Sequence, residues 1–559
     1  MPIRLINTET LALEVFSDPP PYAILSHTWA ENQEVSLRDM ALIAENPFHE
    51  AASRGGYAKI LAACRKARNR GIGHAWIDTC CIDQSSPIEL AEAVNSMFRW
   101  YRDAEVCLAY LSDLPADDPA APETAMRRCR WFTRGWCLQE LIAPRALDLF
   151  DAGWNFWGSR AEMKKSLAAA TGIGEEILDD CAAARSLPVA RRMSWASRRS
   201  TTRPEDGAYC LLGLFDVSIP ILYGEGGPAA FLRLQEEIIR RSNDVSIFCF
   251  VPRTADDFHT HPYVSNANGL ETAETISRLR FCDMLARSAA DFADCGTMVR
   301  RPGAGLAFDE PEFSVTNRGV RLGKRGVYLA PREGVQCYGL EVDYELAGDD
   351  QKQRSTDILL RKIGRGVFAR VPHARVHVPR DERQKTTEEI CVLGRVSPAT
   401  EVDVRKALRR TIRVRVRAAS EGIRAEITSR PSPQESWDEA AGQFLLPRAG
   451  EFSAYLQIKA TDDRGAEKSV FLGCSNGKGM FPYEPRVAMG DASSRDKNKE
   501  EERWSSGLWR FTRVQRASPS HFQLVLGPFR FVGKIVREGA AGGEMFRCTV
   551  EVHRVTNPM

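Results

Sequence analysis

The sequence lacks the signals of several large classes of protein. No apolar run approaches the roughly 18 residues that a helix needs to cross a bilayer. The N-terminus has no basic region followed by an apolar stretch and a small-residue cleavage site. The 15 cysteines show no repeated C-x-x-C spacing, which argues against a zinc ribbon or a disulfide scaffold. We therefore expect a folded cytoplasmic protein with free thiols, no membrane span, no metal site and no bound cofactor.

Common catalytic signatures are missing as well. The chain contains no G-x-x-x-x-G-K-[ST] phosphate loop, no H-E-x-x-H zinc motif and no G-x-S-x-G nucleophile elbow. The glycine-rich segment 224–227 precedes a predicted helix, but it follows no clear strand and lacks the third glycine of a dinucleotide fingerprint. We interpret it as a turn that starts a helix rather than as a phosphate site.

The charge of the chain is unevenly distributed. The 559 residues include 76 Lys and Arg against 74 Asp and Glu, a net charge of +2. Residues 1–250 hold 27 basic and 33 acidic side chains, a net charge of −6, and the remaining 309 residues hold 49 and 41, a net charge of +8. This asymmetry indicates two parts with different surfaces, but neither part is basic enough to predict a nucleic-acid site by itself.

The first 245 residues show the pattern of an α/β domain. Short apolar runs at 22–26, 72–78, 106–111 and 146–150 alternate with amphipathic stretches, which predicts a parallel sheet flanked by helices. The clearest helix starts where Ser86 can cap it, Pro87 takes the first position and Glu89 closes a capping box. We expect the sheet over about residues 20–150 and a helical extension over 151–245.

The remainder, residues 246–559, is predicted to be mainly β. Short runs with period-two alternation are separated by Gly, Pro and Asn turns, as in a β-sandwich or a barrel. The segment 411–417 places Arg413, Arg415 and Arg417 on one face of a strand. Because no aromatic residues for base stacking alternate with the arginines, we favour a solvated outer face over a site for an anionic partner.

Three clusters of polar and aromatic residues follow predicted strands or lie on a short tryptophan-rich helix. In a parallel sheet, ligands bind beyond the carboxyl ends of the strands, so we expect these clusters to converge there. The candidate site residues that they supply are Ser26, His27, Trp29, Asp78, Asp83, Trp136 and Glu140.

Glu140 is the most distinctive acid of this set. Its helix neighbours are apolar, so the carboxyl group is expected in a partly dry cleft, where it can orient ribose hydroxyls and stabilise positive charge on a sugar. The rings of Trp29 and Trp136 can hold a flat group. The alternative, which the residues leave equally open, is that Glu140 pairs with Arg134 or Arg145 and that the tryptophans are core.

The order of motifs resembles the fungal heterokaryon-incompatibility (HET) domain family. The motifs are YAILSHTW at 22–29, WIDTCCIDQ at 76–84, RGWCLQEL at 134–141, TRPEDGAYCLLG at 202–213 and LYGEG at 222–226. The resemblance covers residues 1–245 and implies a role in nonself recognition, in which activated HET domains trigger the death of fused incompatible cells. It assigns no function to residues 246–559.

A more distant resemblance, to TIR domains, concerns the mechanism. Many TIR domains cleave NAD+ at the nicotinamide–ribose bond with a glutamate that corresponds to Glu140, and their sites commonly form across assembled subunits. The resemblance therefore implies an NAD+ glycohydrolase that self-associates through the HET domain, with NAD+ as substrate. The chain departs from the TIR pattern at Cys80-Cys81, at His27 and in the insertion between 150 and 240. The alternative function is a non-enzymatic signalling module that recruits a death effector or other protein partner, with the β-rich half as a ligand sensor.

Overall fold

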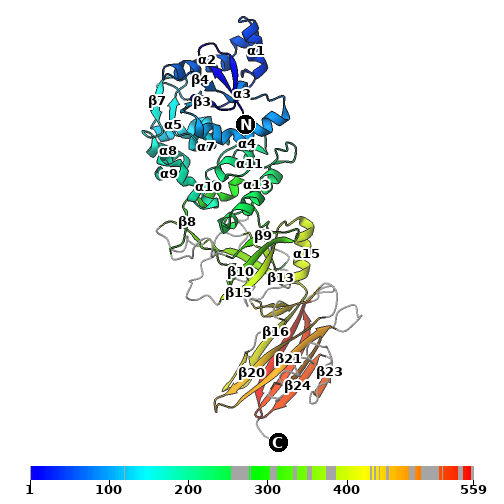
Figure 1. Ribbon diagram of the computed structural model, residues 1–559. Coiled ribbons are helices and arrows are strands. Elements are labelled where there is room, and N and C mark those ends of the chain that lie inside the picture. The colour runs from blue at the N-terminus through cyan, green and yellow to red at the C-terminus, as the bar shows by residue number, and fades with distance from the viewer. Residues whose placement is uncertain are drawn as a thin grey trace. The chain divides into compact units, whose positions relative to one another are not determined.

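The structure is a computed structural model in which the chain forms two compact units (Figure 1). It describes residues 2–559 apart from 117, 119, 254–275, 277–278, 303–310, 331–336, 349–355, 365, 373–384, 429–430, 434–435, 440, 448–451, 477–484, 493–514, 519, 539–544 and 556–559. The first unit consists of Met1–Arg253, Leu285–Glu310 and Val342–Thr356, and the second consists of Thr254–Met284, Pro311–Glu341 and Asp357–Met559. The predicted boundary at residue 245 stays a prediction, because a compact unit can hold more than one evolutionary module.

A seven-stranded sheet forms the centre of the first unit. Its spatial order is β2 (Leu13–Phe16), β1 (Ile3–Asn7), β4 (His74–Trp76), β3 (Tyr22–His27), β5 (Val106–Tyr110), β6 (Leu147–Phe150) and β7 (Phe156–Ser159). The four central strands are parallel, whereas β1, β2 and β7 run antiparallel to their neighbours. The predicted α/β class is confirmed, and the three antiparallel strands, which the sequence pattern did not reveal, make the sheet mixed.

Helices cover both faces of this sheet. Helix α2 (Gly55–Arg68) packs on β3 and β4. On the other face lies α4 (Pro87–Asp103), where the Tyr22 hydroxyl donates to the Trp100 carbonyl at 2.6 Å. The Ser86 side chain caps α4 as predicted, but the Glu89 carboxylate bonds to Arg4 and to the Asp83 amide instead of closing the capping box.

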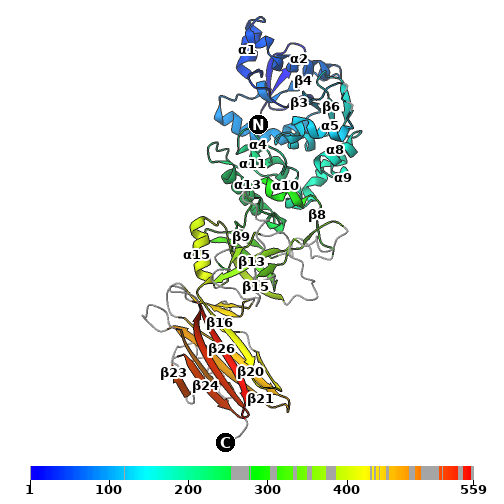
Figure 2. The ribbon, with the colours of Figure 1, turned by 180° about the vertical axis from the view of Figure 1, so that it is seen from behind.

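A group of short helices follows in the chain over residues 164–241, and Figure 2 shows α10, α11 and α13 below α4. Its main members are α8 (Lys164–Thr171), α9 (Glu175–Asp179), α10 (Val189–Ser194), α11 (Asp206–Tyr209), α12 (Leu212–Phe215) and α13 (Gly227–Arg241). The backbone amides of the glycine-rich turn before α13 already have an acceptor within the chain. One Glu205 carboxylate oxygen accepts hydrogen bonds from the amides of Gly224 at 2.9 Å and Gly226 at 3.0 Å. The interpretation of this segment as a turn is thus supported.

The second unit contains a barrel and a sandwich. Five strands close the barrel through the pairing of β10 with β11: β10 (Gly319–Leu329), β11 (Tyr338–Leu340), β13 (Ile358–Gly364), β14 (Val367–Arg370) and β15 (Lys385–Leu393). A short strand, β9 (Phe313–Val315), pairs with β10 outside the ring, and α15 (Pro398–Leu408) follows the barrel strands in the chain. The predicted mainly β class of this region is confirmed.

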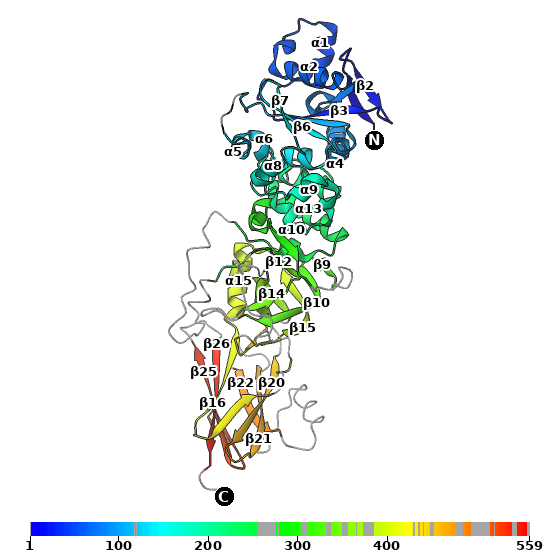
Figure 3. The same ribbon diagram turned by 90° about the vertical axis from the view of Figure 1, so that its left-hand side faces the viewer.

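The sandwich consists of two sheets, which Figure 3 shows as separate layers. One sheet is ordered β18 (Trp437–Asp438), β19 (Gln443–Leu445), β16 (Thr411–Ala418), β26 (Met545–Arg554), β25 (Phe529–Glu538), β24 (His521–Leu526) and β23 (Gln515–Ser518). The other is ordered β17 (Ile423–Ile427), β20 (Ser453–Asp462), β21 (Glu467–Asn476) and β22 (Pro485–Asp491). Apolar side chains from both sheets share one buried core.

Two absences hold for the described part of the chain. None of its helices combines the length and the apolar character needed to cross a membrane. No cluster of His, Cys, Asp and Glu side chains there is arranged to hold a metal ion.

Candidate functional site

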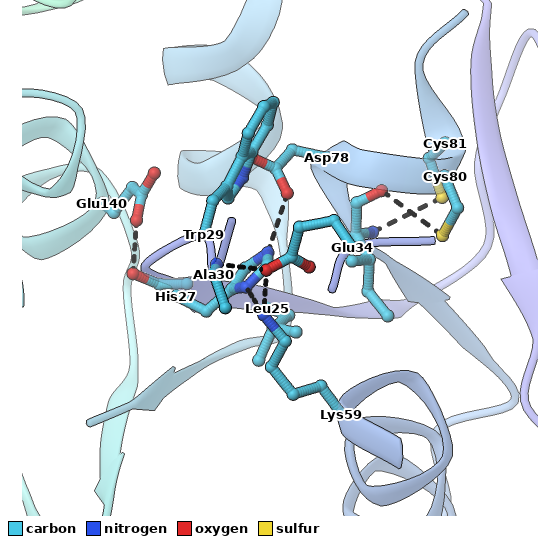
Figure 4. A network of polar contacts seen from close by, with 12 residues as sticks. Leu25, His27, Trp29, Ala30, Glu34, Lys59, Asp78, Cys80, Cys81 and Glu140 are labelled. Atoms are coloured by element: carbon cyan, nitrogen blue, oxygen red, sulfur yellow. Dashed lines mark hydrogen bonds and ion pairs between the residues drawn. The ribbon is translucent and has the colours of Figure 1, made fainter. Parts of the chain in front are cut away.

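The predicted site residues gather around the carboxyl end of β3. The chain passes from β3 to β4 on one side and then to β5 on the other, so this end of β3 is a topological switch point, where open α/β sheets bind their ligands. Because successive side chains of a strand point to opposite faces, Ser26 points toward the α4 side and His27 toward the α2 side. Two polar networks therefore form, one on each face of the sheet. Figure 4 shows Glu140 apart from the group of His27, Asp78 and Lys59.

The first network holds Glu140 through Ser26. Trp131 lies on α6 (Arg130–Thr133), and its indole nitrogen donates to the Ser26 hydroxyl at 2.7 Å. Since an indole N–H can only donate, Ser26 accepts from Trp131 and donates its own hydrogen to Oε2 of Glu140. Glu140 lies on α7 (Cys137–Ile142), which packs on β3 and α4, and all three side chains are buried.

Burial sets the acidity of Glu140. The side chain is 5% exposed, and the loss of solvation raises its pKa to about 7, with the Asp78 charge adding to the effect. The Ser26 hydrogen bond opposes this shift. Among the described residues no cation forms an ion pair with Glu140, and Arg134 donates to Thr202 instead, so the alternative of a structural Glu140–arginine pair is not observed.

The second network runs through His27 on the other face. One imidazole nitrogen lies 2.9 Å from an Asp78 carboxylate oxygen, and the other lies 2.8 Å from the Lys59 ammonium group. This geometry fits a neutral imidazole that donates from Nε2 to Asp78 and accepts at Nδ1 from Lys59. Lys59 also donates to Glu34 at 2.6 Å.

Asp78 connects His27 to Trp29 at the edge of the site. The Trp29 indole nitrogen donates to the second Asp78 oxygen at 2.9 Å, and the Trp29 side chain remains 36% exposed. Burial opposes ionisation of Asp78, but the hydrogen bonds from His27 and Trp29 and the charge of Lys59 outweigh it and lower the pKa of Asp78. Asp78 is therefore an ionised group that holds an exposed aromatic ring in place.

Two predicted site residues lie in other contacts. Asp83 accepts hydrogen bonds from the amide and hydroxyl of Ser85 in the loop before α4. Trp136 donates to Asp206 of α11 at 3.1 Å. The structure thus places Ser26, His27, Trp29, Asp78 and Glu140 in the two networks, whereas Asp83 and Trp136 bond elsewhere.

Three residues of the networks were not selected from the sequence: Trp131, Lys59 and Glu34. Trp131 carried a usable signal, because a buried indole N–H in an apolar helix needs an acceptor. Lys59 and Glu34 carried none, because a lysine on an amphipathic helix and a glutamate in a loop are ordinarily solvated.

Comparisons with known proteins find two family models and one similar fungal protein. Residues 22–127 match the family model described as "Heterokaryon incompatibility protein (HET)", and residues 229–322 match "Domain of unknown function (DUF8212)". The vegetative incompatibility protein HET-E-1 of Podospora anserina is 45% identical over 226 residues, which cover 39% of this chain. The match spans only 16% of that relative's length. No solved structure matches the chain.

Proposed function

We propose that this chain, which carries a HET domain in its N-terminal part, acts in vegetative incompatibility and in the cell death that accompanies it. The match to the HET family model and the similarity to a vegetative incompatibility protein of Podospora anserina support this role. Self-association through the HET domain and contact with further protein partners belong to the same proposal.

The chemistry that we propose is cleavage of NAD+ at the nicotinamide–ribose bond, with Glu140 as the catalytic residue. The observation that carries it is a buried carboxyl group at the switch point, held from one side by Ser26. The glycosidic C–N bond breaks and its electron pair leaves with neutral nicotinamide, so that an oxocarbenium charge develops on the ribose. The Glu140 carboxylate stabilises that charge, and water then bonds to the sugar carbon and releases a proton.

The neighbouring residues have supporting roles in this proposal. Ser26 and Trp131 act as positioning residues, because their hydrogen-bond chain fixes one carboxylate oxygen. His27, Trp29 and Asp78 form the other side of the ligand site, where the exposed Trp29 ring can stack on a flat group. Because only ionised Glu140 stabilises the charge, the rate should rise with pH through about 7, the pKa of that group.

The test is release of nicotinamide from NAD+ by the purified full chain, measured dilute and after artificial clustering. Glu140→Gln should reduce the rate by at least about 100-fold, the usual effect of removing one transition-state contact. Glu123→Gln, which changes an exposed acid in the first turn of α5 (Pro122–Arg128), is the matched control and should leave the rate unchanged. Equal turnover by a folded Glu140→Gln protein would rule out the assignment.

The low exposure of Glu140 favours a second candidate, a non-enzymatic module that recruits a death effector. In that case Glu140 stabilises the fold, and no nicotinamide is released under any condition. Expression in fungal cells separates the two: a folded Glu140→Gln protein that still kills cells supports the module, and one that does not kill supports the enzyme.

A further inference from the structure

The seven-stranded sheet of the sandwich has an outer face that is unusually basic. Along β16, Ile412 and Val414 point into the shared core, so Arg413, Arg415 and Arg417 point outward. The arginines become steadily more exposed along the strand: Arg413 is buried, Arg415 is half-buried and Arg417 is exposed. The predicted ladder is therefore present, with its last two members open to solvent.

The neighbouring strands extend this ladder across the sheet. The register of β16 with β26 places Arg413 beside Arg547 and Arg415 beside Thr549. On β25, Lys534 lies beside Thr549, and Arg530 lies beside His553. The outward basic side chains of these three strands, which we call the basic face, are Arg413, Arg415, Arg417, Arg530, Lys534 and Arg547.

Few acids balance this charge. Outward acids on the same strands are Glu538, which pairs with Arg547, and Glu551, which lies 3.7 Å from His553. Within the described part of the chain, Arg415, Arg417, Arg530 and Lys534 form no ion pair. Burial lowers the pKa of Arg415, and the charges of Arg413, Arg547 and Arg417 lower it further, as expected where like charges crowd together.

The outer face of the other sheet offers a comparison within the same sandwich. There Arg424 pairs with Glu426 at 2.9 Å, and Lys459 pairs with Glu467 at 2.6 Å. Both sheets are solvated on their outer side. These two basic groups of the four-stranded sheet are paired, whereas on the basic face Arg547 is paired but Arg415, Arg417, Arg530 and Lys534 form no ion pair among the described residues. The excess charge on the basic face is therefore a property of that face and not of the sandwich in general.

Aliphatic side chains accompany the basic ones. Val532 and Val536 alternate with Arg530 and Lys534 along β25, and Val525 lies beside Arg530 on β24. Val525 is 53% exposed and Val536 is 44% exposed. The outward positions of β16, β24, β25 and β26 hold no Phe, Tyr or Trp ring, so the stacking platform of a single-stranded nucleic-acid site is missing from these described strands.

We propose that the basic face binds the surface of an anionic lipid membrane. A sheet presents its cations over a broad surface, which suits a lipid bilayer better than a small ligand that needs a pocket. The lysine and arginine groups meet the lipid phosphates, and the exposed valines enter the headgroup layer. The proposal is independent of NAD+ cleavage, because it uses no residue of the N-terminal site.

The test is sedimentation of the full chain with vesicles of phosphatidylcholine alone or mixed with phosphatidylserine. Binding should require phosphatidylserine and weaken as salt is added. The double variant Arg530→Gln and Lys534→Gln changes two exposed residues and should weaken binding by about 25-fold, or about fivefold for each basic group. Val525→Ser should weaken binding in both low and high salt, because its contribution is apolar.

The matched control is the double variant Arg424→Gln and Lys459→Gln on the paired outer face, which should bind as the unaltered chain does. Equal binding to both kinds of vesicle, or an equal loss in test and control variants, would overturn the proposal. So would binding to a single-stranded oligonucleotide in the absence of vesicle binding, since that result assigns the face to nucleic acid.

Discussion

The carboxyl group of Glu140 loses its solvation on folding and receives in return the hydroxyl hydrogen of Ser26. This hydrogen bond only partly replaces the lost solvation of the carboxylate. The pKa of Glu140 therefore rises from an ordinary value of 4.5 to about 7. Since the unfolded chain gives Glu140 its ordinary pKa, the folded chain binds a proton more tightly than the unfolded chain between these two values. The stability of the protein must therefore depend on pH in this range.

The first prediction gives the sign of that dependence. Stability from Glu140 is fully present below about pH 4.5 and is lost as the pH rises through about 7, by an amount of the order of 3 kcal/mol. The measurement is thermal unfolding of the full chain between pH 5 and pH 8, compared with Glu140→Gln. The variant cannot ionise at this position, so the difference between the two proteins should shrink or change sign as the pH rises.

Ser26→Ala is the informative companion variant. Its hydrogen bond lowers the pKa of Glu140, so its removal should raise that pKa and extend the loss of stability to higher pH. It also leaves the Trp131 indole without its acceptor, at a cost of about 1–3 kcal/mol at every pH. A parallel pH profile for the unaltered chain and Glu140→Gln would show that Glu140 ionises in the folded protein as it does in water.

Five of the seven predicted site residues lie in the two networks, but the sequence did not reveal which partners they would bond to. Ser26, His27 and Asp78 follow or end parallel strands, and the carboxyl ends of neighbouring parallel strands meet at one edge. The pairing partners depend on which helix covers which face, and that is decided by tertiary packing. Asp83 illustrates the limit, because it lies only five residues beyond Asp78 yet belongs to the loop that precedes α4.

At the scale of elements, α12 and α4 approach each other through a glycine. A Cβ atom placed on Gly213 would lie 2.0 Å from the Cβ of Phe98, much closer than any carbon–carbon contact allows. The two helices therefore pack as closely as they do because position 213 has no side chain. This explains in physical terms why a glycine follows the two leucines at the end of the 202–213 motif.

The second prediction is that Gly213→Ala destabilises the chain by about 1–3 kcal/mol or more, because the helices must move apart. The matched control is Gly207→Ala in α11, where the nearest atom to an added Cβ is 4.0 Å away. In a helix that substitution should be neutral or stabilising by up to about 1 kcal/mol. Thermal unfolding of the two full-length variants provides the measurement, and equal midpoints would show that α12 adjusts freely.

Helices and strands with a clear apolar run or capping motif could be predicted from the sequence. Strands whose position depends on pairing with neighbouring strands could not. The parallel strands are continuous apolar runs, and α4 has a proper cap, so both appear in the sequence. The strands β1, β2 and β7 lie at or next to the edges of the sheet; they are short and carry mixed burial, which leaves no clear period to detect.

At the scale of the whole molecule, the first unit is assembled from segments that are distant in the sequence. Gln235 of α13 is fully buried and exchanges two hydrogen bonds with Ala286, at 2.8 and 3.0 Å. Phe292 and Met298 are fully buried in the same unit. The match to the DUF8212 family model runs from residue 229 to 322 and so joins α13 to this returning segment. No periodic pattern in the sequence predicts that these later segments pack on the first unit, because each segment is too short to form a hydrophobic core of its own.

The last prediction follows from this arrangement. A chain that ends at residue 245 keeps α13 but loses Ala286, so the buried Gln235 amide is left without two partners, at about 1–3 kcal/mol for each unsatisfied group. It also loses the apolar contacts of Phe292, worth about 3 kcal/mol or more for a buried phenylalanine. We expect this chain to unfold at a lower temperature than a chain ending at Thr356, which keeps every segment of the first unit.

The two chains should be compared by thermal unfolding together with the full chain, and Gln235→Leu in the full chain tests the hydrogen bonds alone. If the shorter chain unfolds at the same temperature as the longer one, residues 1–245 are an independent domain, and the segment Leu285–Glu310 does not contribute to its stability.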